Sequence, residues 1–184
     1  WNIYSVLRQT YPQFVGEKFE IGKTYEGRPI EAFFLSKGGK NEPLKNIILF
    51  TGQHHAREFM TLTMIIEILA QSLASLVQTT PNPLTKIFSN LRILFVPVVN
   101  VDSVTLISNS FGTLDWLRLK NLRKNRHGKD SECPPTDFGG VDLNRNYAKR
   151  FYAKHGEDNS ELKNKCSEEF RGSRPFSEPE TMAI

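Results

Sequence analysis

The sequence predicts an α/β fold with a mixed central sheet flanked by helices in a three-layer α/β/α arrangement. Two observations carry this prediction. A short apolar run at 46–50 ends at Thr51-Gly52, and apolar residues then recur at helical spacing over 62–76. A second short helix (84–91) precedes a second apolar run (93–99), so strands alternate with helices. This alternation is typical of α/β domains, whose ligands bind beyond the carboxyl ends of the strands.

The N-terminal part adds a helix and a hairpin to this pattern. Residues 3–7 favour a short helix that Pro12 stops. Two runs rich in aromatic and branched residues, 14–21 and 29–35, surround Tyr25-Glu26-Gly27-Arg28. A glycine-containing turn between such runs predicts a hairpin toward one edge of the sheet.

The C-terminal part carries weaker signals. The region 108–164 is expected to be rich in loops. Ser177-Glu178-Pro179-Glu180 matches a capping box with Ser177 at the N-cap and Glu180 at N3. Only four residues follow it, so we expect the chain to stop inside an element and the fold to be truncated on its C-terminal side. Because Trp1 stands where an initiator Met would be, we also expect the chain to begin inside a longer product.

Composition indicates one globular domain. The chain has 184 residues, 39% hydrophobic content, 24 Lys+Arg against 20 Asp+Glu, and a formal charge of +4. This excess is too small to demand a nucleic-acid partner. The longest near-apolar stretch, 62–76, is interrupted by polar residues, so no membrane span is predicted.

The first chemical motif lies in the predicted strand-to-helix loop. His55 and Glu58 stand three residues apart there. Zinc binds neutral imidazole nitrogen and carboxylate oxygen, and a catalytic zinc takes three protein ligands with one position left for water. His-x-x-Glu often occurs by chance, so a solvated loop is the alternative for the motif alone.

Further motifs stand in register with this one, and together they resemble the zinc metallocarboxypeptidases of the carboxypeptidase A and B type. The motifs are His55-Ala56-Arg57-Glu58, Arg123-Lys124-Asn125-Arg126, Gly140-Val141-Asp142-Leu143-Asn144-Arg145-Asn146-Tyr147, Phe170-Arg171-Gly172 and Ser177-Glu178-Pro179-Glu180, with Ile21-Gly22-Lys23-Thr24-Tyr25-Glu26-Gly27-Arg28-Pro29 and Val99-Asn100-Val101-Asp102 also matching. The resemblance covers essentially the whole chain. It implies that 1–184 is the N-terminal part of a single catalytic domain.

The resemblance implies a zinc site. It makes His55 and Glu58 zinc ligands and Asp142 the carboxylate that orients His55, because a ligating histidine usually donates its other N–H to such a partner. It places the third ligand, a His, together with the general-base Glu, the mobile Tyr and the specificity-pocket residue, beyond Ile184. We therefore expect 1–184 alone to be inactive and poorly soluble, and the complete protein to be a monomer.

The resemblance also implies substrate contacts. Arg145 with Asn144 clamps the free C-terminal carboxylate of a peptide, Arg126 stabilises the oxyanion, and Arg57 contacts the peptide nearby. Each has an alternative from the residues alone. Arg126 fits a solvated basic run, since 118–129 holds several cations that could also bind a polyanion, and Asn144 and Arg145 fit a turn.

The remaining histidines have no predicted catalytic role, and one loop departs from the pattern of relatives. His54, His127 and His155 are expected to be surface or loop histidines. Relatives usually carry Asn-Pro-Asp-Gly where this chain has Asn100-Val101-Asp102-Ser103, so we expect that loop to be built differently.

Cys133 and Cys166 fall where the family resembled often has a disulfide. If bonded, a loop of about 34 residues would gain roughly 3.7 kcal/mol from the reduced entropy of the unfolded chain. Two free thiols in a reducing cytosol are the alternative. A disulfide favours an oxidising compartment, either secreted or lysosomal.

The predicted function is a zinc-dependent carboxypeptidase that hydrolyses the C-terminal peptide bond of peptides and proteins. The predicted partners are peptide C-termini, without nucleic acid or membrane. The alternative is a catalytically silent relative that binds C-terminal carboxylates through Asn144 and Arg145. The preferred C-terminal residue is not predicted.

Overall fold

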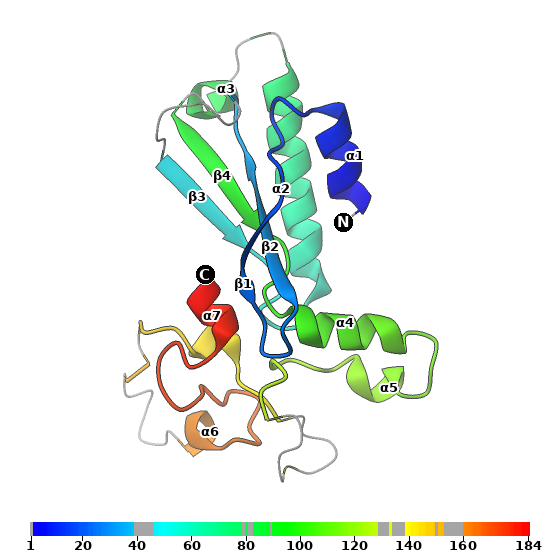
Figure 1. The fold of residues 1–184 in the computed structure, drawn as a ribbon, viewed down its shortest axis with the longest axis vertical. Coiled ribbons are helices and arrows are strands. Elements are labelled where there is room, and N and C mark those ends of the chain that lie inside the picture. Colours follow the sequence, from blue (N-terminus) through cyan, green and yellow to red (C-terminus); the bar gives the residue numbers. More distant parts are fainter. Residues whose placement is uncertain are drawn as a thin grey trace. The chain divides into compact units, whose positions relative to one another are not determined.

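A computed structural model describes residues 2–38, 46–78, 80, 83–88, 90–128, 133, 139–149, 151–152 and 160–184. The chain forms two compact units (Figure 1). The first is built from the described residues of Trp1–Phe19, Glu31–Gly52 and Met60–Pro97. The second is built from those of Glu20–Ile30, Gln53–Phe59 and Val98–Ile184.

The sheet is mixed, as predicted. Its strands are β1 (Phe19–Lys23), β2 (Pro29–Leu35), β3 (Asn46–Thr51) and β4 (Leu91–Val96), in the order β1-β2-β4-β3. Strand β2 runs antiparallel to β4, with Phe33 opposite Phe95, and β3 runs parallel to β4, with Ile48 opposite Ile93. A parallel pair needs a crossover connection, which α2 (Phe59–Val77) and α3 (Pro83–Phe88) occupy between β3 and β4.

The core of the first unit lies between this sheet and the helices α1 (Asn2–Thr10) and α2. One stripe of α2, formed by Ile65, Leu69, Leu73 and Leu76, is buried against Phe33 and Phe95. Tyr4 and Leu7 of α1 pack against the same cluster. The recurrence of apolar residues at helical spacing thus becomes the packed face of α2.

By length and composition, α2 is apolar enough to cross a membrane, with a mean hydropathy of 1.7 over its most apolar window. The core helix of a soluble domain meets the same criteria. One stripe of α2 packs against the sheet, and 28% of the apolar window is buried inside the structure.

The structure changes three details of the predicted elements. Strand β1 begins at Phe19 and not at residue 14, because Phe14 lies in the turn that follows α1 and Val15 forms an isolated bridge with Leu35. Leu91 begins β4 and does not end the preceding helix. Strand β3 is not a buried strand, and Ile47 is 50% exposed. The reason is that β3 lies at the edge of the described sheet.

In the second unit, the described residues of 108–164 are rich in loops, as predicted. Its helices are α4 (Val101–Ser110), α5 (Trp116–Leu119), the 3-10 helix η2 (Leu143–Arg145), α6 (Ser160–Lys163) and α7 (Pro179–Ala183). Helix α4 was not predicted. The Asn100 side chain accepts a hydrogen bond from Ser103 N at its start, so the loop without the usual Pro and Gly is built as a helix cap.

The predicted capping box is wrong. Glu178 is the N-cap of α7, which places Pro179 at the first helical position. Ser177 Oγ donates to the Glu178 carboxylate at 2.7 Å, and the Glu180 carboxylate accepts from Tyr25 N at 3.0 Å. Both side chains are therefore engaged by other partners and do not close the helix end.

Candidate functional site

The loop 53–58 is held in place within the second unit by backbone contacts. Ala56 N donates to Arg123 O at 3.3 Å, and Arg57 N donates to Leu122 O at 2.9 Å. The buried Asn100 reinforces this, because its Nδ2 lies 3.2 Å from both His54 O and Arg123 O. The loop and residues 122–123 therefore hold each other in a defined position.

The two predicted zinc ligands face each other in this loop. His55 Nδ1 lies 2.8 Å from Glu58 Oε1. The His55 side chain is 6% exposed, whereas that of Glu58 is 44% exposed. One nitrogen and one oxygen therefore lie in direct contact, with solvent access from the Glu58 side.

Asp142 lies behind His55 and is fully buried. Its Oδ1 is 2.8 Å from His55 Nε2, and its Oδ2 accepts from Arg123 Nη2 at 2.7 Å and from Arg123 Nε at 3.2 Å. Burial acts to raise the pKa of Asp142, but hydrogen bonding and charge from His55 and Arg123 outweigh it and lower that pKa below its ordinary value. Asp142 is therefore an ionised acceptor for His55 Nε2, and Nδ1 is the nitrogen that faces Glu58.

This donor set fits zinc. Ligands at about 2.1 Å in tetrahedral geometry lie roughly 3.4 Å apart, so a small opening of the His55–Glu58 pair would admit the ion. Within the described residues no cluster of three or more His, Cys, Asp or Glu side chains could hold a metal. The pair offers two donors, one fewer than the three protein ligands that a catalytic zinc usually takes.

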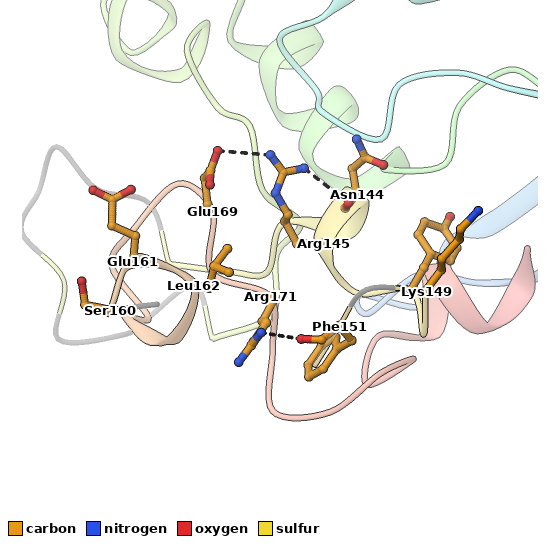
Figure 2. Close-up of a pocket in the computed structure, with 10 residues that line it drawn as sticks. Asn144, Arg145, Lys149, Phe151, Ser160, Glu161, Leu162, Glu169 and Arg171 are labelled. Atoms are coloured by element: carbon orange, nitrogen blue, oxygen red, sulfur yellow. Dashed lines mark hydrogen bonds and ion pairs between the residues drawn. The ribbon is translucent and has the colours of Figure 1, made fainter. Parts of the chain in front are cut away.

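Asp142 also organises the turn that carries Asn144 and Arg145. Its Oδ1 accepts a hydrogen bond from Asn144 N at 2.9 Å and so caps η2. A cavity of about 690 Å³ lies beside this turn, and Figure 2 shows Asn144, Arg145 and Glu169 along its wall. One buried carboxylate therefore fixes both His55 and the turn predicted to bind the substrate.

Each of the three predicted substrate arginines is paired with a glutamate. Arg57 bonds Glu168 through both terminal nitrogens, at 2.7 and 2.8 Å. Arg145 Nη2 donates to Glu169 Oε1 at 3.1 Å, and Arg126 Nε lies 3.6 Å from Glu26 Oε1. The hydrogen bond to Glu168 raises the pKa of Arg57, and the same bond lowers the pKa of Glu168.

Sequence reasoning missed several residues that build the site. Arg123 contacts Asp142 and lies 3.4 Å from Glu58 Oε1. In the motif that contains it, only Arg126 was predicted to have a role. Asn125 is fully buried, and its Oδ1 accepts from Val141 N at 2.8 Å. Asn146, also fully buried, bonds Ser177 Oγ at 2.8 Å. Each of these residues lies inside a motif of the sequence analysis, so its place in that motif was a signal that could have identified it.

Two of the three remaining histidines have specific partners. His54 is not an ordinary surface residue, because its Nε2 lies 2.7 Å from the Tyr147 hydroxyl. Burial, aided by the neighbouring His55, lowers the pKa of His54 to about 4, so a neutral ring forms the hydrogen bond with the Tyr147 hydroxyl. His127 stacks on Tyr25 and contacts Glu178 at 2.8 Å. His155 lies outside the described residues.

The predicted disulfide is confirmed. Cys133 and Cys166 are bonded, with Cα atoms 5.3 Å apart. Next to it, the buried Lys124 donates from Nζ to Lys165 O at 3.0 Å and to Ser167 O at 2.7 Å. The segment that bears Glu168 and Glu169 is therefore anchored at its N-terminal side.

A mixed sheet flanked by helices, an imidazole and a carboxylate facing each other, and a buried aspartate behind the imidazole fit a zinc-binding protein in which a carboxylate orients a ligating histidine. The zinc carboxypeptidase family matches residues 2–184. The chain belongs to this family, which confirms the resemblance drawn from the motifs. The family implies zinc as the metal.

Individual relatives support the same family assignment. The chain is 38% identical over 160 residues to metallocarboxypeptidase A of Trichophyton tonsurans, covering 86% of this chain and 33% of that protein. It is 30% identical over 188 residues to carboxypeptidase B2 of Bos taurus, covering 100% of this chain and 39% of that protein. The crystal structure of thrombin activatable fibrinolysis inhibitor matches with a TM-score of 0.72 and 28% identity, covering 99% of this chain and 40% of the other. The chain thus spans less than half the length of these relatives.

Proposed function

We propose that this protein is a zinc-dependent carboxypeptidase that removes the C-terminal residue of peptides and proteins. One observation carries the proposal. Asp142 Oδ1 contacts both His55 Nε2 and Asn144 N, at 2.8 and 2.9 Å. A metal ligand and the start of a carboxylate-binding turn therefore depend on the same buried oxygen, which is the arrangement an exopeptidase needs to set a scissile bond beside its metal.

His55 and Glu58 would hold the zinc, with Arg123 and Asp142 keeping the imidazole and carboxylate oriented. When bound, zinc polarises a carbonyl and lowers the pKa of a bound water. The disulfide supports a location in an oxidising compartment, secreted or lysosomal, for the protein.

The substrate is a peptide chain end. Arg145 is 35% exposed and forms part of the cavity wall, so its planar fork can meet a planar carboxylate from that side. Arg126 is the residue we assign to the oxyanion that develops at the scissile carbonyl. Because the fork selects a free carboxylate, the proposal requires cleavage from the C-terminus only.

The test uses the complete, zinc-loaded protein and a pair of peptides that differ only in a free or amidated C-terminus. We expect hydrolysis of the free peptide alone. We also expect His55→Ala and Glu58→Ala to abolish zinc measured by atomic absorption, while Glu67→Ala, an exposed carboxylate on α2, keeps it. Retention of stoichiometric zinc in both site variants contradicts the metal assignment. Equal cleavage of both peptides contradicts the exopeptidase assignment, and selective binding without turnover indicates the catalytically silent relative.

A further inference from the structure

Two consecutive glutamates contact two different arginines of the proposed substrate site. Glu168 bonds Arg57, and Glu169 bonds Arg145. The arginines lie 88 positions apart in the sequence (145 − 57), yet residues adjacent in the chain contact both of them. The segment Lys165–Arg171, here called the acidic segment, is therefore placed to control how each arginine meets a ligand.

The two pairs differ in how much of the arginine they occupy. Both terminal nitrogens of Arg57 point at the Glu168 oxygens, and Nη1 also donates to Asn121 O at 3.1 Å. Both terminal nitrogens of the Arg57 guanidinium are therefore occupied by protein acceptors. Arg145 gives Glu169 only Nη2, and its Nη1 makes a long 3.4 Å contact to Asn144 O. Arg145 therefore keeps donors for a second carboxylate, whereas Arg57 has few left.

The acidic segment is fixed independently of the two ion pairs. Lys124 Nζ holds the carbonyls of Lys165 and Ser167, and Glu169 N donates to Ser167 Oγ at 3.1 Å. On the other side, Asp142 N donates to Phe170 O at 2.8 Å. Glu169 thus sits on backbone that is anchored on both sides, so its carboxylate is a stable reference point for a long and otherwise mobile arginine side chain.

We propose that Glu169 is a positioning residue for the carboxylate clamp. It holds the Arg145 guanidinium by one N–H and directs the remaining N–H groups toward the substrate carboxylate. Glu168 occupies the donors of Arg57, so that Arg57 does not bind this carboxylate. This proposal rests on the proposed function, since it assigns Arg145 a carboxylate ligand. Figure 2 shows the Glu169 carboxylate directed at the Arg145 guanidinium along the cavity wall. An exposed pair of this kind orders a side chain with little net stabilisation, so its removal should affect binding more than folding.

The experiment measures binding of an acetylated tripeptide with a free C-terminal carboxylate, and of its amide, by calorimetry with the complete, zinc-loaded protein. Glu169→Gln keeps the shape and removes the charge. We expect about three- to fivefold weaker binding of the free peptide, unchanged binding of the amide, and an unchanged melting temperature. Glu20→Gln is the matched control, because Glu20 is exposed on β1 and is not among the residues that line the cavity, and it should leave both affinities unchanged.

A double-mutant cycle separates positioning from a general charge effect. In an Arg145→Ala background, Glu169→Gln should change the affinity for the free peptide by less than a factor of about 1.5, because there is no guanidinium left to position. Equal or tighter binding of the free peptide by Glu169→Gln overturns the inference, as does the same loss in the Arg145→Ala background. If the unsubstituted protein binds free and amidated peptides equally, the proposed function fails first, which distinguishes the two failures.

Discussion

Asp142 Oδ1 lies 2.8 Å from His55 Nε2, and both side chains are withdrawn from solvent. The contact fixes which imidazole nitrogen faces Glu58, because His55 Nε2 donates to the ionised Asp142 and Nδ1 is the nitrogen left beside Glu58 Oε1. Arg123 completes the arrangement by bonding the second oxygen of Asp142. The proposed metal site is therefore oriented before any ion binds.

The first prediction concerns this orientation. Asp142→Asn keeps the shape but puts an amide where the carboxylate faces donors from His55 and Arg123, so one amide N–H must meet another donor. We expect zinc affinity to fall about 10- to 100-fold, measured by competition with a chromophoric chelator. Asp115→Asn, an exposed aspartate ahead of α5, is the control and should bind zinc normally. An unchanged affinity in Asp142→Asn would show that Asp142 does not support the metal.

The second prediction concerns substrate polarity. Arg145→Lys keeps the positive charge but loses the fork that pairs with a planar carboxylate. We expect a higher KM and a lower kcat/KM for peptides with a free C-terminus, while cleavage of amidated peptides stays negligible. Steady-state kinetics with both peptides provides the check, and exposed Arg118→Lys is the matched control. A variant with the kinetics of the parent would exclude Arg145 from carboxylate recognition.

Part of the site was predictable because its chemistry is local in the sequence. His55 and Glu58 share one loop, and Asp142, Asn144 and Arg145 share one motif, so the resemblance could assign them roles. The glutamates that pair with Arg57 and Arg145 were not foreseen. Glu168 lies 111 residues from Arg57, and nothing in a surface Glu-Glu pair distinguishes it from an ordinary solvated one.

The fold shows the same division. Strand β2 was predicted at its exact bounds, Pro29–Leu35, because a glycine turn and a proline mark its start. The exposure of β3 was not foreseen, because an apolar run does not state whether its strand is central or at an edge. Helix α4 was missed because Val101–Ser110 contains several β-branched and serine residues with low intrinsic helix propensity. Its cap at Asn100 is an ordinary side chain that gains its role from the buried contacts around it.

The third prediction concerns the backbone beneath Asp142. Gly140 has φ of +110°, and a Cβ there would lie 2.2 Å from Asn125 O. Gly140→Ala must therefore move backbone, and we expect a loss of about 3 kcal/mol or more in the free energy of unfolding, measured by urea denaturation. Gly128→Ala is the control, since φ is +65° and nothing lies within 4 Å of the added Cβ. It should cost about 1 kcal/mol, and equal costs for the two variants would contradict the steric argument.

The fourth prediction concerns pH and the buried Glu180. Burial raises the pKa of Glu180 above its ordinary value of 4.5, and the charge of Glu178 adds to this, although hydrogen bonds from Tyr25 N and Asn125 Nδ2 oppose it. A pKa raised by folding means that the native state holds its proton more tightly than the unfolded chain does. The stability from Glu180 is therefore fully present below pH 4.5 and is lost as pH rises through the raised pKa.

Glu180→Gln cannot ionise, so it lacks this loss. We expect the free energy of unfolding of the variant, relative to the parent, to become more favourable as pH rises from below 4.5 through the raised pKa, and then to level off. Urea denaturation across a pH series gives this difference, and the exposed Glu161→Gln should show almost none of it. The slope and not the absolute value is decisive, because the amide also changes the hydrogen bond to Asn125 at every pH. A difference that is constant with pH, or that turns against the variant as pH rises, would mean that Glu180 is not held against ionisation by its burial.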